Sequence, residues 1–343
     1  MKKMLNTLYV LSEDAYVSLN GETVKIEFPE RASQRIPLHT LENIVIFSYK
    51  GASPALMGKC EECGISICFF TPCGKYLASI GAVVKGNVYL RRTQYRYADD
   101  EKIALDISRN MIFGKIHNAK QVLLRANRDH AMQVDVDKIS KATNRLDEYL
   151  QQIKVLDNKD SLRGIEGSAA VEYFSVFNEL VLRQKANFEF TERSRRPPLD
   201  RINAMLSFAY SLLANECASA LLSVGLDPYA GFFHVDRPGR KSLALDLMEE
   251  FRSVYADRFV LTLINNQVIK ANDFELQDSG AVLFKNDAKK SFVAKWQERK
   301  RTEIMHPFLK EKIPWGLAMY TQALLLARYL RGDLDQYPPF FWR

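Results

Sequence analysis

The sequence predicts a multi-domain α+β protein in which an N-terminal β-sandwich domain precedes a larger all-α C-terminal domain. In residues 1–90, short runs of alternating apolar and polar residues are separated by frequent turn residues, as in a sandwich. From about Asp99 onward, apolar residues recur instead at helical spacing. A chain of 343 residues is also long for one domain. We therefore divide it into a sandwich of residues 1–93, a linker of residues 94–100 and a catalytic helical domain of residues 101–343.

The clearest element of the first part is a β-hairpin centred on Asn20-Gly21. Alternating runs at residues 16–19 and 24–28 flank this dipeptide, whose two residues tolerate the positive φ angles of a hairpin turn. A short helix is expected at Ser53–Cys63, because Ser53 can cap its first turn and Gly64 can end it. The remaining apolar runs predict strands over residues 44–47, 65–70, 76–80 and 88–90.

The second part begins with an apolar stripe from Ile103 to Leu123, at intervals of three, four and five residues. Leu146, Leu150 and Ile153 repeat at the same helical spacing. Further helices are predicted over residues 161–182, 200–224, 242–263 and 314–331. This succession of helices without alternating runs is what predicts an all-α domain.

Composition and charge narrow the class of protein without selecting one. Hydrophobic residues make up 47% and charged residues 26% of the chain, which excludes a disordered chain, a collagen and a coiled-coil rod. The net charge of +7 permits a polyanionic partner but does not require one. No apolar run approaches the roughly 18 residues of a membrane helix, and no signal-peptide cleavage pattern follows the N-terminus. We therefore expect a cytoplasmic protein without a membrane partner.

Four of the five cysteines lie between Cys60 and Cys73. Cys60 and Cys63 have the spacing of half a zinc site, but a second pair with matching spacing is missing. Cys68 lies in an apolar run, where a thiol acts as a small apolar side chain. We expect these thiols to be structural. The sequence has no phosphate loop and no dinucleotide-binding motif, so no nucleotide cofactor is implied.

One candidate functional carboxylate is Glu166, which lies between Gly164 and Gly167 at the head of a predicted helix. Each glycine inside a helix costs about 1 kcal/mol relative to alanine, a cost tolerated where a backbone or a ligand must come close. Glu166 is therefore either a carboxylate in a tight site or a residue favoured by the positive N-terminal end of the helix dipole.

A second group of candidates surrounds residue 234. His234 lies in an aromatic, turn-rich loop, and Ser242 is a suitable N-cap for the helix that follows. On this helix Asp246 and Glu249 are three residues apart and share one face, close to apolar residues. Carboxylates there need a cation or hydrogen-bond donors, because their desolvation is costly. The alternative is that Asp246 complements the helix dipole while Glu249 faces water.

These residues combine into a candidate metal site. Carboxylate oxygens with one imidazole suit Mg²⁺ or Mn²⁺ better than structural zinc. We predict that Glu166, His234 and Glu249 bind the ion, which would polarise a phosphoryl oxygen and activate a hydroxyl nucleophile. For Asp246 three roles stay open: support of a ligand, binding of a second metal ion, or action as a base.

Basic residues with interleaved aromatic residues predict contact with a nucleic acid backbone and exposed bases. One segment contains Arg195 and Arg196, and another covers residues 285–301, in which Phe292 and Trp296 lie among lysines and arginines. A charge run can equally be a solvated face. The candidate nucleic-acid-binding residues are Arg195, Arg196, Arg252, Lys285, Lys289, Lys290, Arg299, Lys300 and Arg301.

Taken together, these segments resemble the family of CRISPR-associated Cas1 endonucleases, which act in spacer acquisition. The resemblance rests on the runs 164–170, 195–208, 233–234 and 242–252, with 38–44 and 91–95 in the first part. Their order and spacing are specific, and they extend over nearly the whole chain. The segment 337–342, Tyr-Pro-Pro-Phe-Phe-Trp, is similar to that of the type I-C branch.

The resemblance implies a homodimer formed largely through the β domains, together with assembly with Cas2 and, in this branch, often with Cas4. It implies that Glu166, His234 and Glu249 bind the metal ion, with Asp246 beside them. It also implies that the 3′-hydroxyl ends of short DNA fragments (prespacers) are joined to a CRISPR repeat by transesterification. The family often has aspartate as its third ligand, whereas Glu249 is one methylene longer. The cysteine cluster is not part of the family pattern.

Three other interpretations of the sequence remain. The same glutamates and histidine would serve a metal-dependent hydrolase of small phosphoesters, against which the basic segments argue. The chain could be a non-catalytic DNA-binding subunit, in which Glu166, His234 and Glu249 are ordinary polar residues. It could also be an adaptor structured by zinc at the cysteines of residues 60–73.

Overall fold

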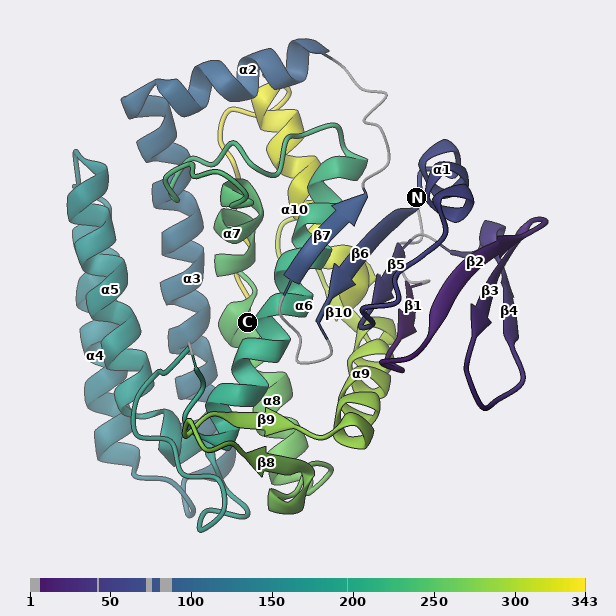
Figure 1. Cartoon of the computed structure of the whole chain (residues 1–343). Helices are drawn as coiled ribbons and strands as arrows, with labels where there is room; N and C mark the ends of the chain where they lie inside the picture. The colour runs from purple at the N-terminus through teal and green to yellow at the C-terminus, as the bar shows by residue number, and fades with distance from the viewer. Residues whose placement is uncertain (1–6, 42, 72–75, 81–87, 196, 343) are drawn as a thin grey trace.

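The computed structural model describes residues 7–41, 43–71, 76–80, 88–195 and 197–342. Figure 1 shows two N-terminal sheets at one side of the molecule and the long helices at the other. The three-stranded sheet is the outer one, and the four-stranded sheet lies between it and the helices. The chain thus has N-terminal strands and a mostly helical C-terminal region, as the predicted α+β class requires.

Two sheets form the N-terminal part. In the first, β1 (Thr7–Val10), β5 (Asn43–Ile46), β6 (Ser66–Phe70) and β7 (Tyr76–Ile80) lie side by side in that order. The β1–β5 and β5–β6 pairs are parallel, and β6–β7 is antiparallel. The second sheet is antiparallel, with the order β2 (Tyr16–Asn20), β3 (Thr23–Glu27) and β4 (Gln34–Pro37). The parallel pairs require crossover connections, and one of them carries α1 (Pro54–Cys63).

The first sheet is buried on both faces. Because successive side chains point to opposite faces, Ile44 and Ile46 pack against the second sheet and α1. Val45 and Phe47 belong instead to the core of the helical region. The Phe47 ring stacks on Phe70 and also meets Phe208 of a helix, with centroids 5.1 and 5.7 Å apart. The sheet therefore belongs to two cores at once.

The local predictions for this part are confirmed at the hairpin and at the short helix. Asn20 ends β2 and pairs with Thr23, so the turn consists of Gly21 and Glu22, one residue beyond the predicted centre, and Gly21 has a φ of +56°. The Ser53 side chain accepts a hydrogen bond from the Leu56 backbone and caps α1. Gly64 ends α1 with a φ of 71°, which favours glycine because a Cβ atom would be strained there.

The predicted strand at 88–90 is wrong, because α2 covers Val88–Asp99, and most of the predicted linker at 94–100 is part of the same helix. A short apolar run does not distinguish a strand from the start of a helix. The helix is anchored by Gln94, whose buried amide donates to the carbonyls of Asp227 and Ala230 at 2.7 and 2.9 Å. Asp100 then caps the next helix. The connection is therefore a packed helix whose position is fixed by the helical region.

The helical region contains the long helices α3 (Glu101–His130), α4 (Val136–Ile153) and α5 (Lys159–Ser175), which pack together along one side. Behind them lie α6 (Arg201–Ser223), α7 (Ser242–Glu249), α8 (Arg258–Asn265), α9 (Asn286–Arg301) and α10 (Trp315–Leu330). Short 3₁₀ turns cover Leu38–Thr40, Phe177–Leu180 and Ala271–Asp273.

The prediction of an all-α second domain is wrong in detail. Two antiparallel strand pairs occur there, β8 (Phe274–Leu276) with β9 (Val282–Phe284) and β10 (Glu303–Met305) with β11 (Lys312–Pro314). Each strand is three residues long and too short to show alternation in the sequence. The helix predicted over 242–263 is interrupted by a π-helical segment at Arg252–Asp257. Such segments often occur at functional sites.

Helix α6 is the centre of the helical region. It is the one described helix with the length and apolar composition of a membrane span, but 61% of its most apolar window is buried inside the protein. Its neighbours include α7, α10 and the π-helical segment. Its apolar character is that of a core helix.

The cysteines are distributed as expected for structural thiols. Cys60 and Cys68 are buried, whereas Cys63 is exposed. Burial raises the pKa of the Cys60 thiol to about 12, which disfavours the thiolate that a metal would bind. Cys73 lies outside the described residues.

Candidate active site

Asp246 organises the loop that carries His234. Its carboxylate is fully buried, and each oxygen accepts two hydrogen bonds. Oδ1 accepts from the backbone and from Nδ1 of His234 at 2.9 and 2.6 Å, and Oδ2 accepts from the backbone of Phe232 and Phe233 at 2.7 and 3.0 Å. A carboxylate can only accept, so Nδ1 of His234 carries a proton, and in the neutral imidazole the lone pair is then on Nε2. Of the three roles left open for Asp246, these contacts favour support of a ligand.

Gly231 allows this loop to approach α7 closely, and sequence reasoning missed it. A Cβ atom on Gly231 would lie 2.7 Å from Cβ of Ser242 and 3.0 Å from Oδ2 of Asp246. It would also lie 3.0 Å from the carbonyl oxygen of His234. The first distance is shorter than van der Waals contact allows. The loop can therefore pack against the Asp246 carboxylate only with glycine at position 231.

We expect Gly231→Ala to lower the melting temperature and the activity together, because the added methyl group pushes the loop off Asp246. Gly167→Ala is the matched comparison, since a Cβ there meets nothing within 4 Å. At that half-buried helical position alanine should raise the free energy of unfolding by up to about 1 kcal/mol. Thermal unfolding of both variants checks this. Equal stability of Gly231→Ala and the wild type would show that the loop has room to spare.

Glu249 is held as a buried anion by two cations. Its side chain is 5% exposed, and Nη1 of Arg252 lies 2.9 and 3.0 Å from its two oxygens. Nζ of Lys115, from α3, lies 2.7 Å from Oε2. Burial alone would raise the pKa of Glu249, but Arg252, Lys115 and His234 together hold it well below its usual range. The carboxylate is therefore ionised at neutral pH.

Glu166 meets the same cation from a third helix. Its Oε1 contacts Nζ of Lys115, so that one ammonium joins Glu166 to Glu249. Glu166 lies about two turns inside α5, beyond the reach of the dipole at the helix N-terminus. The dipole interpretation is therefore not supported. Gly164 and Gly167 border open space, which leaves the surface beside Glu166 accessible.

A cavity of about 460 Å³, partly open to solvent, is lined by Glu166 and by the two cations that contact Glu249. Its polar lining includes Lys115, Glu166, Arg195 and Arg252, and its apolar wall comes from α3, α4 and α5. Two predicted nucleic-acid-binding residues, Arg195 and Arg252, thus lie beside Glu166. Arg195 is exposed, and the cationic lining suits a phosphate group.

Tyr210 on α6 supports Arg252 in this cavity. The guanidinium of Arg252 lies 4.5 Å from the centroid of the Tyr210 ring. The Tyr210 hydroxyl donates to Oδ1 of Asp257 at 2.6 Å. Burial raises the pKa of Asp257 to about 6, although Tyr210 and Arg252 act in the opposite direction. The π-helical segment therefore fixes the cation that pairs with Glu249.

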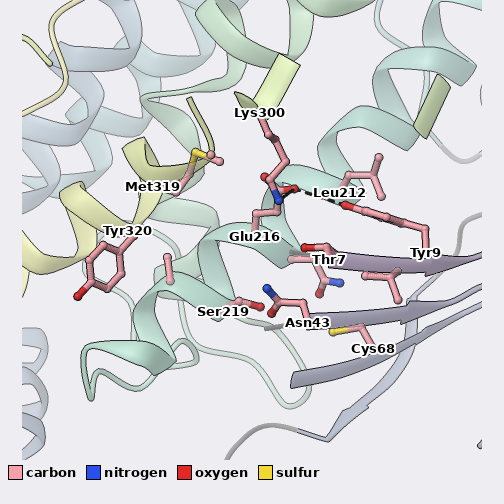
Figure 2. Close-up of a pocket in the computed structure, with 14 residues that line it drawn as sticks. Thr7, Tyr9, Asn43, Cys68, Leu212, Glu216, Ser219, Lys300, Met319 and Tyr320 are labelled. Carbon is pink, nitrogen blue, oxygen red and sulfur yellow. Dashed lines mark hydrogen bonds and ion pairs between the residues drawn. The ribbon is translucent and has the colours of Figure 1, made fainter. Parts of the chain in front are cut away.

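Three residues of the second basic segment are not surface cations. Lys289 and Lys300 are 6% and 2% exposed, and the Arg299 side chain donates to the carbonyl of Val254 and lies over Tyr255. Figure 2 shows Lys300 reaching Glu216 beside Tyr9 of β1. Nζ of Lys300 lies 2.9 Å from Oε1 of Glu216. Burial and internal partners of this kind argue against contact between these three residues and a DNA backbone, against their prediction as nucleic-acid-binding residues.

The other candidates of the basic segments remain predictions. Lys285, Lys290 and Arg301 are exposed on α9 or at its start. Nζ of Lys290 lies 2.8 Å from Asp287 in a solvent-exposed ion pair, as on many solvated faces. Arg196 lies outside the described residues.

The residues present fit a cation between Glu166 and Glu249, because both carboxylates already contact one, the ammonium of Lys115. His234 lies close enough to Glu249 to lower its pKa. In the part of the chain that the structure describes, no three His, Cys, Asp or Glu side chains converge tightly enough to hold a metal ion. For the two glutamates, the ammonium of Lys115 occupies the position between their carboxylate oxygens. Sequence reasoning missed Lys115, which has no local signal within α3.

Glu250, the neighbour of Glu249, is fully buried and binds the C-terminal segment. It accepts hydrogen bonds from the Tyr337 hydroxyl at 2.5 Å, the Phe340 backbone at 2.6 Å and the Gln322 amide at 3.0 Å. Asn118 of α3 donates to the carbonyls of Glu250 and Phe340, both at 2.7 Å. The segment that follows α10 thus packs directly behind the helix that carries Glu249.

Burial raises the pKa of Glu250 from its ordinary 4.5 to about 7, against the effect of its hydrogen-bond donors. Between these values the folded protein binds a proton that the unfolded chain does not. We therefore expect the free energy of unfolding to fall, by up to about 3 kcal/mol from this group, as pH rises from 4.5 to 7. Denaturant titrations at several pH values should show that Glu250→Gln loses this slope. An unchanged slope would assign the pH dependence to other groups.

The model of the CRISPR-associated protein Cas1 family matches residues 8–298 of this chain. The chain belongs to the Cas1 family. A Cas1 endonuclease of Chlorobaculum tepidum is 48% identical over 343 residues, and all of both chains is covered. A Cas4 exonuclease/Cas1 endonuclease fusion of Geobacter sulfurreducens is 34% identical and covers 98% of this chain, which spans 60% of the fusion. The predicted family is confirmed, whereas the type I-C branch stays a prediction.

Solved structures of Cas1 and related proteins share the fold. A casposase bound to its integration product has a TM-score of 0.83 at 23% identity, and 98% of this chain and 94% of that chain are covered. A Cas1 protein from Thermotoga maritima has a TM-score of 0.83 at 23% identity, with 97% and 99% covered. A Cas6-RT-Cas1–Cas2 complex has a TM-score of 0.84 at 22% identity, with 100% and 37% covered. At these identities the likeness extends to the fold alone.

Proposed function

We propose that this Cas1 protein is a metal-dependent DNA endonuclease and integrase of CRISPR adaptation. The observation that carries the proposal is the convergence of Glu166 and Glu249 on one cation, beside His234 and a cavity lined by Arg195 and Arg252. Ionised carboxylates from separate helices fit a hard cation, and the neighbouring arginines fit phosphate. Named Cas1 endonucleases among its relatives support the same activity.

The residues that would hold Mg²⁺ or Mn²⁺ are Glu166, His234 and Glu249. When bound, the ion would supply charge stabilisation at the phosphoryl oxygens. Asp246 keeps the proton of His234 on Nδ1, so that Nε2 is available as a ligand. Arg252 orients Glu249 through two contacts and brings positive charge to the mouth of the cavity.

The proposed reaction joins the 3′-hydroxyl end of a prespacer to the CRISPR repeat by transesterification. A new bond forms between the attacking 3′-oxygen and phosphorus, and the phosphorus–oxygen bond of the repeat strand breaks. The attacking hydroxyl loses its proton to solvent, and the displaced 3′-oxygen takes one up. One phosphodiester replaces another, so no nucleotide cofactor is needed. Backbone contacts from Arg195 and Arg252 would position the DNA without reading its sequence.

The proposed partners follow from the family and its named assemblies. DNA, as prespacer and as CRISPR repeat, is the substrate, and the exposed residues Arg195, Lys285, Lys290 and Arg301 are candidate contacts. We propose a homodimer formed through the N-terminal strands, since two strand ends require two active sites at a fixed spacing. The Cas1–Cas2 complex supports Cas2 as a partner, and the Cas4/Cas1 fusion supports Cas4. We further propose a cytoplasmic location and the type I-C branch.

The experiment that tests the proposal is strand transfer of a short 3′-hydroxyl DNA into a supercoiled plasmid that contains the repeat. Mg²⁺ or Mn²⁺ is supplied, and the assay is run with and without Cas2. Joined product that requires the divalent ion is the expected result. Failure to join or nick the plasmid, with Cas2 present and DNA bound, would favour a non-catalytic DNA-binding subunit.

A further inference from the structure

Lys115 has no role in the function proposed above, yet it lies at the centre of the candidate site. Its Nζ contacts Oε1 of Glu166 and lies 2.7 Å from Oε2 of Glu249. The side chain is 12% exposed, so these contacts are shielded from solvent. The ammonium joins three helices, α3, α5 and α7, at the position where a metal ion would meet both carboxylates.

The charges of this cluster balance. Glu166 and Glu249 carry two negative charges, and Lys115 and Arg252 carry two positive charges in direct contact with them. A divalent ion added to the intact cluster would bring two further positive charges close to Lys115 and Arg252 in a poorly solvated place. Like charges a few ångströms apart repel strongly there. One cation must therefore move when a divalent ion binds.

Lys115 is the cation that can move. Arg252 is fixed by two contacts with Glu249 and by the Tyr210 ring. Lysine carries its charge on a flexible chain of four carbons, without the planar fork that holds an arginine in place. Lys115 also lines the cavity beside Glu166, which gives its ammonium a place to go.

We propose that Lys115 is an internal counter-ion that holds Glu166 and Glu249 together and exchanges with the divalent ion. The proposal rests on the proposed metal site. Lys115 is on this account a positioning residue, which sets the affinity for metal and pre-orders the two carboxylates. After exchange its ammonium adds to the positive charge of the cavity, where a DNA phosphate can neutralise it. Metal and DNA phosphate should therefore strengthen each other's binding.

The test is titration of the full-length, DNA-free protein with Mn²⁺ in a calorimeter. Lys115→Met removes the competing charge and keeps the length of the side chain, so it should bind Mn²⁺ about tenfold more tightly than the wild type. Without metal this variant should melt at a lower temperature, and saturating Mn²⁺ should close the gap. Lys115→Arg keeps the charge on a less mobile group and should bind Mn²⁺ no more tightly than the wild type. The matched control is Lys120→Met, which removes a second lysine of α3 that pairs with Asp147 and should leave Mn²⁺ affinity unchanged.

The wild-type protein offers a second measurement that does not depend on how the variants fold. With ¹³C-labelled lysine, Mg²⁺ should move the side-chain NMR signal of Lys115, identified by its loss in Lys115→Arg, toward that of a mobile lysine. The inference is overturned if Lys115→Met binds Mn²⁺ no more tightly than the wild type, or if bound Mg²⁺ leaves the Lys115 signal unmoved. Loss of binding in Glu166→Gln shows that the measured site is the proposed one. If Glu166→Gln binds Mn²⁺ as tightly as the wild type, the proposed metal site is wrong, and the proposed exchange with Lys115 is wrong with it.

Discussion

Glu166→Gln is expected to abolish strand transfer while folding and DNA binding stay close to wild type. Glutamine keeps the size of the side chain but removes the negative charge that, with Glu249, attracts the cation. Loss of a metal contact of several kcal/mol corresponds to a decrease of about a thousandfold in rate. The assay is joining of a 3′-hydroxyl DNA to the repeat plasmid, with DNA affinity and melting temperature measured alongside.

Glu172→Gln is the control for this prediction. Glu172 lies on the same helix, and its carboxylate is 3.5 Å from Arg145 of α4 instead of contacting the site's cation. It should retain strand transfer. If Glu166→Gln also retained it, Glu166 would not be a metal ligand, and the role of Glu249 would need a different explanation.

The second large effect is expected for Asp246→Asn, which should lose both stability and activity. Four N–H groups converge on the carboxylate, and an asparagine amide has one oxygen to offer them. Its NH₂ group would face donors, and each buried donor left unpaired costs about 1–3 kcal/mol. The loop would shift, His234 would lose its fixed orientation, and strand transfer should fall at least about a hundredfold.

Thermal unfolding and Mn²⁺ titration distinguish this role from direct binding of metal. A supporting role predicts a lower melting temperature for Asp246→Asn even without metal. A direct ligand would instead lose Mn²⁺ affinity at an unchanged melting temperature. Asp236→Asn is the control on the same loop, because its exposed carboxylate accepts one hydrogen bond, from the Gly231 backbone at 3.1 Å.

The sequence predicts those parts of the fold that local chemistry decides. The hairpin between β2 and β3 and the caps of α1 depend on the backbone preferences of a few neighbouring residues, and they are confirmed, with the turn one residue later than predicted. The anchored helix α2 is missed because Gln94 is buried against carbonyl groups more than 130 residues away in the sequence. No local pattern announces such a partner. The same holds for the three-residue strands β8 to β11, whose pairing depends on the surrounding helices.

The candidate site shows the same division. Glu166, His234, Asp246 and Glu249 are visible in the sequence because carboxylates and imidazole stand out beside glycines and apolar residues. Lys115 and Gly231 are not, since their roles arise from contacts between helices and between a loop and a helix.

The basic segment of residues 285–301 misleads for a related reason. Helical periodicity turns every third or fourth residue inward, and in α9 that face carries Lys289 and Lys300 as well as Phe292 and Trp296. Each of the two lysines is buried with a polar partner: Lys289 with Asn286, and Lys300 with Glu216. Sequence composition counts such cations as surface charge.

The four-stranded sheet has a consequence for how the molecule unfolds. Its two faces serve different cores, and Tyr9 of β1 reaches toward Glu216, which α6 presents to Trp296 and Lys300 of α9. Separating the sheet from the helices would expose the Lys300–Glu216 ion pair to solvent and remove the packing contacts of Val45 and Phe47. We therefore expect the N-terminal strands and the helical region to unfold together in one cooperative transition. A displacement imposed on the strands, as in a subunit contact, would be carried as rigid-body motion to the helices that hold Glu166 and Glu249.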